Sequence, residues 1–353
     1  MKLVRTSYKP EDVTILLKDI SGAIEPMSTE QRERKIQSGT HYCEMLPIEY
    51  QPSTEYLRLY EYALKNFSKE TAYGVRIAAE RIYADKKAPV LISLARAGLP
   101  AGIMMKHYLE RKYHIEVPHF AVSIIRGKGI DGNAMKYILD RYDGERIQFV
   151  DGWTGKGAIQ HQLNAAMKDY AGIDPRVAVI ADPAGITPFC GTHDDFLIAS
   201  SCLNSVVSGL ISRTVLRDDL IAPDDFHGAV YYGEFAGNDR SYEFIDTVES
   251  VMSYEDISRE RDEMPSVTGY DEAYDIMERL RISDINFIKP GIGETTRVLL
   301  RRVPYKVLIA EDCPEKYVAH IIELAREKNV PVEKYPLKRY RCCGIIRNMP
   351  SDA

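Results

Sequence analysis

The chain has no segment that looks able to enter or cross a membrane. No run approaches about 18 uninterrupted apolar residues, and the best candidate, APVLISLARAGLPAGIMM, is broken by Arg96. The N-terminus, MKLVRTSYKPEDVT, lacks the apolar core of a secretion signal. We therefore expect a cytoplasmic protein without a membrane partner.

Paired cysteines are also missing. The six cysteines contain no C-x-x-C pair, so neither a disulfide framework nor a zinc site is expected. Cys342 and Cys343 are adjacent, and on a strand one of them should be buried and the other exposed. The six are Cys43, Cys190, Cys202, Cys313, Cys342 and Cys343.

Length and charge indicate two unlike domains. A chain of 353 residues is too long for one average domain. Residues 281–353 hold 14 Lys and Arg against 9 Asp and Glu, so this stretch carries +5 and the rest carries −11 of the net −6. A basic C-terminal stretch on an acidic body points to nucleic acid for that stretch only, or to a chance fluctuation of surface charge.

Apolar runs alternate with helical patterns along the first 200 residues. APVLISLA, PHFAVSII, RIQFV and RVAVIAD read as buried strands, and amphipathic helical segments lie between them. This alternation predicts an α/β fold with a parallel sheet covered by helices on both faces. Ligands in such sheets bind at the carboxyl ends of the strands, where the loops 95–98, 126–129, 151–157 and 181–185 should meet.

The stretch IQFVDGWTGKGAIQHQL, residues 147–163, is a strand, a Gly-rich turn and a helix. Its glycine spacing fits neither a nucleotide P-loop nor a dinucleotide fingerprint. Free N–H groups at a helix start suit a phosphate monoester, and Asp151 at the strand tip suits sugar hydroxyls. The pattern favours a ribose 5-phosphate site, against the alternative of an ordinary tight turn.

These residues resemble a known signature. IQFVDGWTGKGAI is similar to the PRPP-binding motif of type I phosphoribosyltransferases, and LISLARAGLPAGI resembles their pyrophosphate loop. More closely, AVSIIRGKGID, FVDGWTGKGAI and LNSVVSGLISRTVL resemble the phosphoribosyltransferase-like family found with tellurite-resistance and stress-response genes, which is also described as the StiP cysteine protease family and carries a C-terminal Pelota-type domain. The resemblance implies a type I phosphoribosyltransferase-like sheet.

The resemblance implies transfer of ribose phosphate from PRPP to a base-like acceptor, with Mg²⁺. Asp151 would bind the ribose hydroxyls and the metal, and Arg126 and Lys128 would join Arg96 against pyrophosphate. Gly152 stands where the family signature has a second acid, and Asp182 or Asp131 would have to compensate. The resemblance implies that two loops hold the ligand. The first contains Ala95, Arg96, Ala97 and Gly98, and the second contains Gly152, Thr154, Gly155, Lys156 and Gly157.

A second polar cluster lies in ADPAGITPFCGTHDD. Asp182 and His193 are predicted to contact the acceptor, with His193 moving a proton. The same cluster supports a rival enzyme class, because Cys190 with His193, or Cys43 with His41, would form a cysteine peptidase pair. A third alternative is a sensor of PRPP or a nucleotide without catalytic activity.

The C-terminal stretch resembles the Pelota and ribosomal-protein family that binds kinked RNA. The matching turn is Gly291-Ile292-Gly293-Glu294-Thr295-Thr296-Arg297. The resemblance implies that Gly291, Glu294, Arg297 and Arg301 contact structured RNA, although a module for protein contacts fits the pattern too. We therefore expect a phosphoribosyltransferase-like domain over residues 1–255 with a cap at about 1–55, a linker over 256–269, and a small α/β/α domain over 270–353. The sequence leaves a homo-oligomer open.

Overall fold

The structure, a computed structural model, describes residues 1–255 and 264–347, except for two side chains in helix α1. Most of the predicted linker, residues 256–263, lies outside these residues. Among the described helices, none is both long enough and apolar enough to span a membrane.

A six-stranded parallel sheet forms the centre of the N-terminal part, here residues 1–255. Its strand order is β1-β6-β5-β9-β10-β11, and every neighbouring pair runs parallel. The strands are β1 (Thr14–Ile15), β6 (His119–Val122), β5 (Val90–Leu94), β9 (Ile147–Trp153), β10 (Ala178–Ala181) and β11 (Cys190–Thr192). The predicted parallel α/β sheet is thereby confirmed.

The sheet is buried on both faces, which explains its continuous apolar runs. Leu91, Val150 and Ile180 point into one apolar cluster, whereas Ile92 and Phe149 point into the other. Alternate residues of one strand therefore serve opposite faces.

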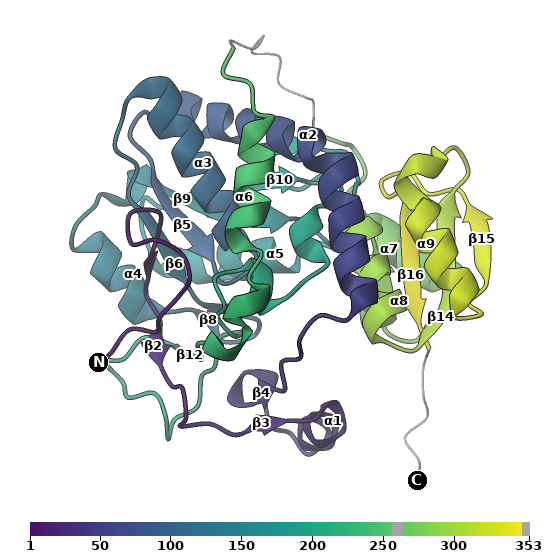
Figure 1. The fold of residues 1–353 in the computed structure, drawn as a ribbon, viewed down its shortest axis with the longest axis horizontal. Coiled ribbons are helices and arrows are strands. Elements are labelled where there is room, and N and C mark those ends of the chain that lie inside the picture. The colour runs from purple at the N-terminus through teal and green to yellow at the C-terminus, as the bar shows by residue number, and fades with distance from the viewer. Residues whose placement is uncertain (256–263, 348–353) are drawn as a thin grey trace.

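Helices cover both faces, as Figure 1 shows. α2, α3 and α6 pack on one face, and α4 and α5 supply Met135 and Leu163 to the cluster on the other. Ser53 begins the long α2 by accepting a hydrogen bond from the Tyr56 N–H. The helices are α2 (Thr54–Asp85), α3 (Gly98–Tyr113), α4 (Gly132–Leu139), α5 (Ala158–Ala166) and α6 (Ser241–Ser250).

The first 50 residues and several short strands surround one end of the sheet. The Tyr42 hydroxyl accepts a hydrogen bond from the Arg126 N–H at 2.9 Å, so this segment contacts the loop after β7, and a cap over residues 1–55 stays a prediction. The remaining elements here are β2 (Lys18–Asp19), β3 (Pro26–Met27), α1 (Thr29–Gln37), β4 (Leu46–Pro47), β7 (Ile124–Ile125), β8 (Gly129–Ile130) and β12 (Gly228–Ala229).

The C-terminal part, here residues 264–347, has its own four-stranded sheet in the order β13-β16-β14-β15. Helix α7 supplies Ala273 and Ile276 to one face, while Leu299 of α8 and Ile321 of α9 pack on the other. The elements are α7 (Gly269–Arg279), β13 (Ile288–Pro290), α8 (Ile292–Arg301), β14 (Pro304–Ala310), α9 (Glu315–Glu327), β15 (Val332–Tyr335) and β16 (Cys342–Ile346). The predicted compact α/β/α arrangement is what this part of the chain adopts.

One expectation for this sheet is wrong. Cys342 and Cys343 both lie on β16, but both are buried rather than split between core and solvent. They do point to opposite faces, Cys342 into the cluster with α8 and α9 and Cys343 into the cluster with α7. Helices cover both faces, so neither thiol reaches water.

The two parts share one apolar core. Phe67 of α2 stacks on Tyr317 of α9 with ring centroids 5.8 Å apart. The hydroxyls of Tyr56 and Tyr62, also on α2, donate to the carbonyls of Leu300 and Lys316 at 3.1 and 3.2 Å. In Figure 1, α2 accordingly runs between the large sheet and the C-terminal part. The C-terminal part is thus held against the body rather than tethered by its linker alone.

Candidate functional site

The predicted loops at the carboxyl ends of the strands do meet. A cavity of about 420 Å³ is lined by residues of the loops after β5, β7 and β9 and by residues of the C-terminal part. The lining includes Ala97, Arg126, Asp151, Thr154, Gly155, Lys156 and Gly157 from the predicted ligand loops and Glu294 and Arg297 from α8. The sequence therefore predicted these neighbours correctly, although it did not predict that the C-terminal part closes the cavity.

Cations dominate this cavity. Burial, with Lys289 nearby, lowers the pKa of Lys156 to about 8, and its amine donates to the Ile285 carbonyl at 2.6 Å. Burial raises the pKa of Asp151 to about 6, and one carboxylate oxygen accepts from the Gly152 N–H at 2.8 Å. A site of this charge suits an anionic ligand. The assignments of phosphate to these loops and of Mg²⁺ to Asp151 stay predictions.

Other predicted ligand residues lie outside the lining of this cavity. Arg96 donates to the Ile211 carbonyl at 2.9 Å and lines a neighbouring pocket of about 50 Å³. Gly98 begins α3 where any Cβ would meet the Val150 carbonyl at 2.3 Å. Lys128 is exposed on the loop after β7, Ala95 follows β5, and Gly152 lies within β9. Lys128, Ala95 and Gly152 are absent from the residues that line the larger cavity.

Asp131 does not replace the missing acid of the signature. It is the N-cap of α4, and its carboxylate accepts from the N–H groups of Asn133, Ala134 and His227. Like Asp182 and His193, it is not among the residues that line the larger cavity. Asp182 and His193 lie in a separate cluster at the sheet edge, and their contact with an acceptor near residues 181–195 stays a prediction.

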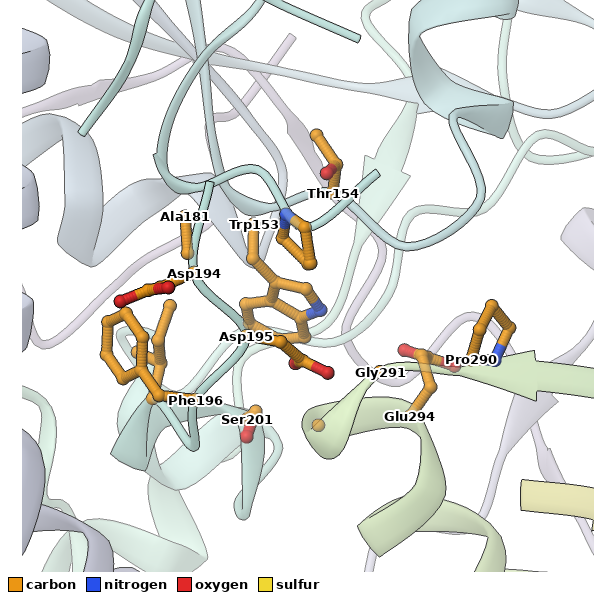
Figure 2. A pocket seen from close by; sticks show the side chains of 13 residues that line it. Trp153, Thr154, Ala181, Asp194, Asp195, Phe196, Ser201, Pro290, Gly291 and Glu294 are labelled. Atoms are coloured by element: carbon orange, nitrogen blue, oxygen red, sulfur yellow. The ribbon is translucent and has the colours of Figure 1, made fainter. Parts of the chain in front are cut away.

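The residues predicted to contact RNA face the N-terminal part. Figure 2 shows Gly291 and Glu294 beside Trp153 and Ser201, around a narrow pocket of about 10 Å³. Arg297 donates to the Ser201 carbonyl at 3.1 Å. Arg301 donates to the side chain of Asn204 and to the Cys202 carbonyl at 2.7 and 3.0 Å. In this arrangement Arg297 and Arg301 bond the N-terminal part, and RNA binding stays a prediction.

Asp195 forms hydrogen bonds between the N-terminal part and the C-terminal part. Its two carboxylate oxygens accept from the N–H groups of Ile292 at 2.9 Å and Arg341 at 3.0 Å. The side chain is only 5% exposed, and burial raises its pKa to about 6. A single carboxylate therefore satisfies two buried backbone donors across the interface.

Replacing Asp195 should loosen this interface. We expect Asp195→Ala to lower the free energy of unfolding by about 2–4 kcal/mol, because two buried N–H groups lose their acceptor. Asp194→Ala is the matched control, since the exposed Asp194 only pairs with Arg341 at 3.3 Å and such pairs contribute about 0–1 kcal/mol. Urea unfolding of both variants measures the difference, and equal midpoints would contradict this role.

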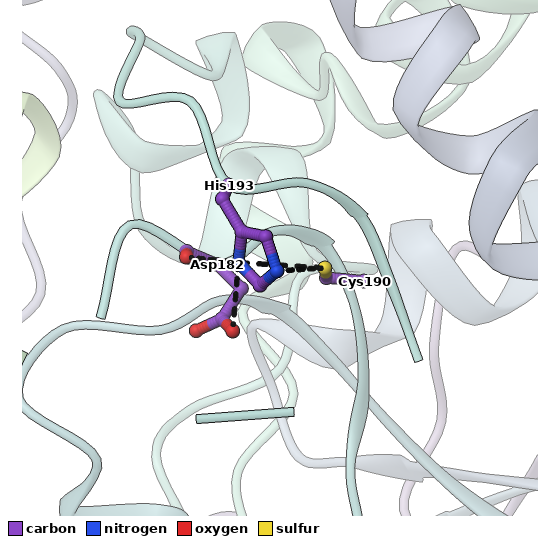
Figure 3. Close-up of side chains that lie close together, drawn as sticks. All are labelled: Asp182, Cys190 and His193. Carbon is purple, nitrogen blue, oxygen red and sulfur yellow. Dashed lines mark hydrogen bonds and ion pairs between the residues drawn. The ribbon is translucent and has the colours of Figure 1, made fainter. Parts of the chain in front are cut away.

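A separate cluster lies at the edge of the large sheet, and Figure 3 shows it. Asp182 follows β10, Cys190 begins β11 and His193 follows β11, so the hydrogen bonds between these two strands bring the three together. The Cys190 sulfur is 3.7 Å from both ring nitrogens of His193. His193 Nδ1 is 3.3 Å from a carboxylate oxygen of Asp182. The same nitrogen lies 3.1 Å from the Asp182 carbonyl oxygen. A nucleophile, a base and an acid that can orient the base therefore contact one another.

The surroundings of the cluster favour a charged imidazole. The hydrogen bonds to Asp182 and Cys190 raise the pKa of His193 to about 10. Arg81 of α2 places a guanidinium nitrogen 3.4 Å from the Cys190 sulfur and donates to the Cys190 carbonyl at 2.6 Å. Two cationic neighbours are the environment in which reactive cysteines are found.

Asp182 is fixed by its own partners. It accepts from the hydroxyl of Thr154 at 2.5 Å and from the N–H groups of Ile186 and Thr187 at 2.7 and 3.0 Å. Since Thr154 also lines the cation-rich cavity, one hydrogen bond connects that cavity to the Cys190 cluster.

The other predicted pair, His41 and Cys43, differs in two ways. Nδ1 of His41 lies 2.9 Å from the Cys43 sulfur, but it also caps a short turn by accepting from the Cys43 N–H. Within residues 1–255 and 264–347, no carboxylate bonds the His41 ring. Burial raises the pKa of the Cys43 thiol, which disfavours the reactive thiolate.

The remaining four thiols are protonated at neutral pH. Burial raises the pKa of Cys202 and Cys343 to about 12, that of Cys342 well above its usual range, and that of Cys313 to a smaller extent. Among the described residues, none of the four has a histidine partner. Cys190 is therefore the one cysteine with both a basic partner and an acid behind it.

Sequence reasoning found Cys190 and His193 as a pair but missed two members of the cluster. Asp182 was assigned to a ligand instead of to the histidine, although its place at the tip of a strand marked it as a site residue. Arg81 gave no signal, because it is one charged residue on a long amphipathic helix.

Comparison with known proteins identifies relatives of both parts. The family described as tellurite-like stress resistance cysteine protease StiP matches residues 6–249, and the PELOTA RNA binding domain matches residues 267–348. The cysteine protease StiP of Acinetobacter baylyi is 32% identical over 364 aligned residues, covering 97% of this chain and 94% of that protein.

Ribosomal proteins resemble a shorter stretch of the chain. The large ribosomal subunit protein eL8 of Halobacterium salinarum is 39% identical over 75 residues, covering 20% of this chain and 62% of that protein. The eL8 protein of Haloquadratum walsbyi is 42% identical over 62 residues, covering 17% and 52%. No solved structure matches the chain.

These matches correct the main functional expectation. Transfer of ribose phosphate from PRPP was predicted, with a phosphoribosyltransferase as the enzyme class, and both are wrong because the family and the full-length relative are cysteine proteases. Gly152 gives a physical reason why ribose phosphate transfer is not expected, since the second acid that would bind the ribose hydroxyls is absent. The rival prediction of a cysteine peptidase fits better.

Proposed function

This chain belongs to the StiP family of tellurite-like stress resistance cysteine proteases, and we propose that it is a peptidase whose nucleophile is Cys190. The observation that carries the assignment is the convergence of Cys190, His193 and Asp182, whose ligand atoms lie within 4.8 Å of one another. Among the described cysteines only Cys190 has a histidine that is itself oriented by a carboxylate.

The chemistry follows the order of the three groups. The Cys190 sulfur attacks the carbonyl carbon of a peptide bond, and the proton of His193 passes to the leaving amine nitrogen as the C–N bond breaks. Water then attacks the thioester and loses its proton to His193, which releases the acid and restores the sulfur. Asp182 holds the imidazole in place and stabilises its charged form.

Access to the sulfur requires local movement. Cys190 has no exposed surface, and the side chain of His193 is 13% exposed. The segment that joins Asp182 to Cys190 contacts the C-terminal part, because the Ala184 carbonyl accepts from the Gly269 N–H at 2.7 Å. The proposal therefore includes displacement of the segment 183–189 before substrate reaches the sulfur.

The pH dependence tests this assignment. With fluorescent casein as substrate, we expect hydrolysis by the full chain to persist through neutral and mildly alkaline pH and to fall as the pH passes about 10, where His193 loses its proton. The same raised pKa stabilises the fold fully below the ordinary value of 6.5, and this stabilisation is lost as the pH rises through about 10.

Two results would count against the proposal. Iodoacetamide, which alkylates thiols, should abolish hydrolysis, so activity that survives complete alkylation would exclude a cysteine nucleophile. A fall of activity centred near pH 6.5 would mean that His193 does not carry the raised pKa.

The finer fold assignment belongs to the same proposal. We infer that the large sheet keeps the type I phosphoribosyltransferase-like arrangement, in which the loops after successive strands form one ligand site. What supports this inference is that the loops after β5, β7 and β9 line one cation-rich cavity. A sheet with that arrangement can carry a peptidase active site at its edge, because function is determined by the site and not by the fold.

A further inference from the structure

We propose that Asp182, Cys190 and His193 also form a binding site for a zinc ion. Within the described residues this is the group of three ligating side chains whose donor atoms converge within 4.8 Å of one another. Thiolate, imidazole and carboxylate are the three ligand types that zinc takes in proteins. The absence of C-x-x-C pairs argued against a zinc site, but the pairing of β10 with β11 brings Asp182 beside Cys190 and His193.

The separations of the donor atoms are near those of ligands around a single metal ion. A tetrahedron built from ordinary Zn–S, Zn–N and Zn–O bonds has edges of roughly 3.3–3.6 Å. His193 Nδ1 lies 3.3 Å from the Asp182 carboxylate and 3.7 Å from the Cys190 sulfur, so two of the three edges are near these values, and the third is within 4.8 Å. His193 Nδ1 also lies 3.1 Å from the Asp182 carbonyl oxygen, a hydrogen bond that this nitrogen would give up on binding the metal.

The groups around the trio are those that orient metal ligands. The Thr154 hydroxyl bonds one carboxylate oxygen of Asp182, and the N–H groups of Ile186 and Thr187 bond the other. Arg81 points a guanidinium nitrogen at the Cys190 sulfur at 3.4 Å. The partners of Asp182 fix the orientation of that ligand, as the outer partners of metal ligands do. Three protein ligands leave the fourth position of the tetrahedron for water.

Zinc at this site would occupy the sulfur and the imidazole together. Zinc binding itself needs only the three ligands and stands whether or not the chain is a peptidase. Its consequence, reversible inhibition of hydrolysis, rests on the proposed function, because the metal would hold the nucleophile and the base. Binding and inhibition are measured separately, so the failure of one is distinguishable from the failure of the other.

Direct metal binding is the experiment. Full-length protein is stripped with a chelator, loaded with Zn²⁺, freed of excess metal and assayed for zinc by mass spectrometry. We expect one zinc per chain in the wild type and in the control Cys43→Ser, and at least about 100-fold weaker binding in Cys190→Ser and His193→Ala. Thr154→Val, which removes only an outer partner, should weaken binding about 10–100-fold.

Two readouts on the wild type keep the test independent of misfolded variants. Cobalt in place of zinc should give a thiolate-to-metal charge-transfer band in the near ultraviolet, and bound zinc should protect Cys190 from iodoacetamide while the accessible Cys313 still reacts. Substoichiometric zinc in the wild type, no such cobalt band, an alkylation rate of Cys190 that zinc leaves unchanged, or full affinity in Cys190→Ser would each overturn the site.

Discussion

Cys190→Ser should reduce kcat/KM for peptide hydrolysis by roughly 10³-fold or more, because removal of a catalytic nucleophile leaves only binding and electrostatic contributions. His193→Ala should cost about as much, since residues that act as a unit do not contribute additively. The double variant should then be no worse than either single one. Initial rates with fluorescent casein measure all three.

Cys43→Ser is the matched control for this prediction. Cys43 is also a fully buried cysteine with a neighbouring histidine, but it lacks the carboxylate behind that histidine. We expect unchanged hydrolysis in this variant. Loss of activity in Cys43→Ser together with normal activity in Cys190→Ser would assign the nucleophile to the other pair and refute the account.

Gly191→Ala should destabilise the protein by about 3 kcal/mol or more. A Cβ at Gly191 would lie 2.0 Å from the carbonyl oxygen and 2.3 Å from the Cα of Gly74 on α2, and backbone atoms of a packed helix cannot yield as a side chain does. The helix crosses β11 closely because both residues are glycine. Gly191 stands directly after Cys190, so the same change should displace the sulfur and abolish hydrolysis.

Gly237→Ala is the control for the glycine substitution. No atom lies within 4 Å of a Cβ built there, so we expect a change of no more than about 0.5 kcal/mol. Urea unfolding compares the two variants. If the midpoint of Gly191→Ala matched that of Gly237→Ala, the contact between α2 and β11 would not be as tight as described.

Much of the fold was predictable because its signal is local. The strands β5, β9 and β10 are continuous apolar runs, and burial on both faces makes such runs long enough to recognise. β11 was missed, since its three residues, Cys190, Gly191 and Thr192, include no apolar run. Its existence depends on pairing with β10 and on close contact with α2, which are tertiary effects.

The site was predictable only in part for a related reason. The Gly-rich loops pointed to a shared cavity, and its lining bears out that they are neighbours. Arg297 and Arg301 were predicted to contact RNA, and nothing in the sequence indicated that they bond carbonyls and a side chain of the N-terminal part. The contacts between two parts of a chain depend on both parts, and the hydrophobic periodicity of either part does not reveal them. A pattern of charged residues alone therefore cannot distinguish an exposed surface from an interface.

The measurement that tests the central claim most directly is the identity of the cysteine that forms a covalent adduct. The full-length protein is incubated with a peptide carrying a thiol-reactive group at its scissile position, and the modified residue is located by peptide mass mapping. The account predicts a single adduct on Cys190 that fails to form in His193→Ala. An adduct on Cys43, with Cys190 unmodified, would contradict it.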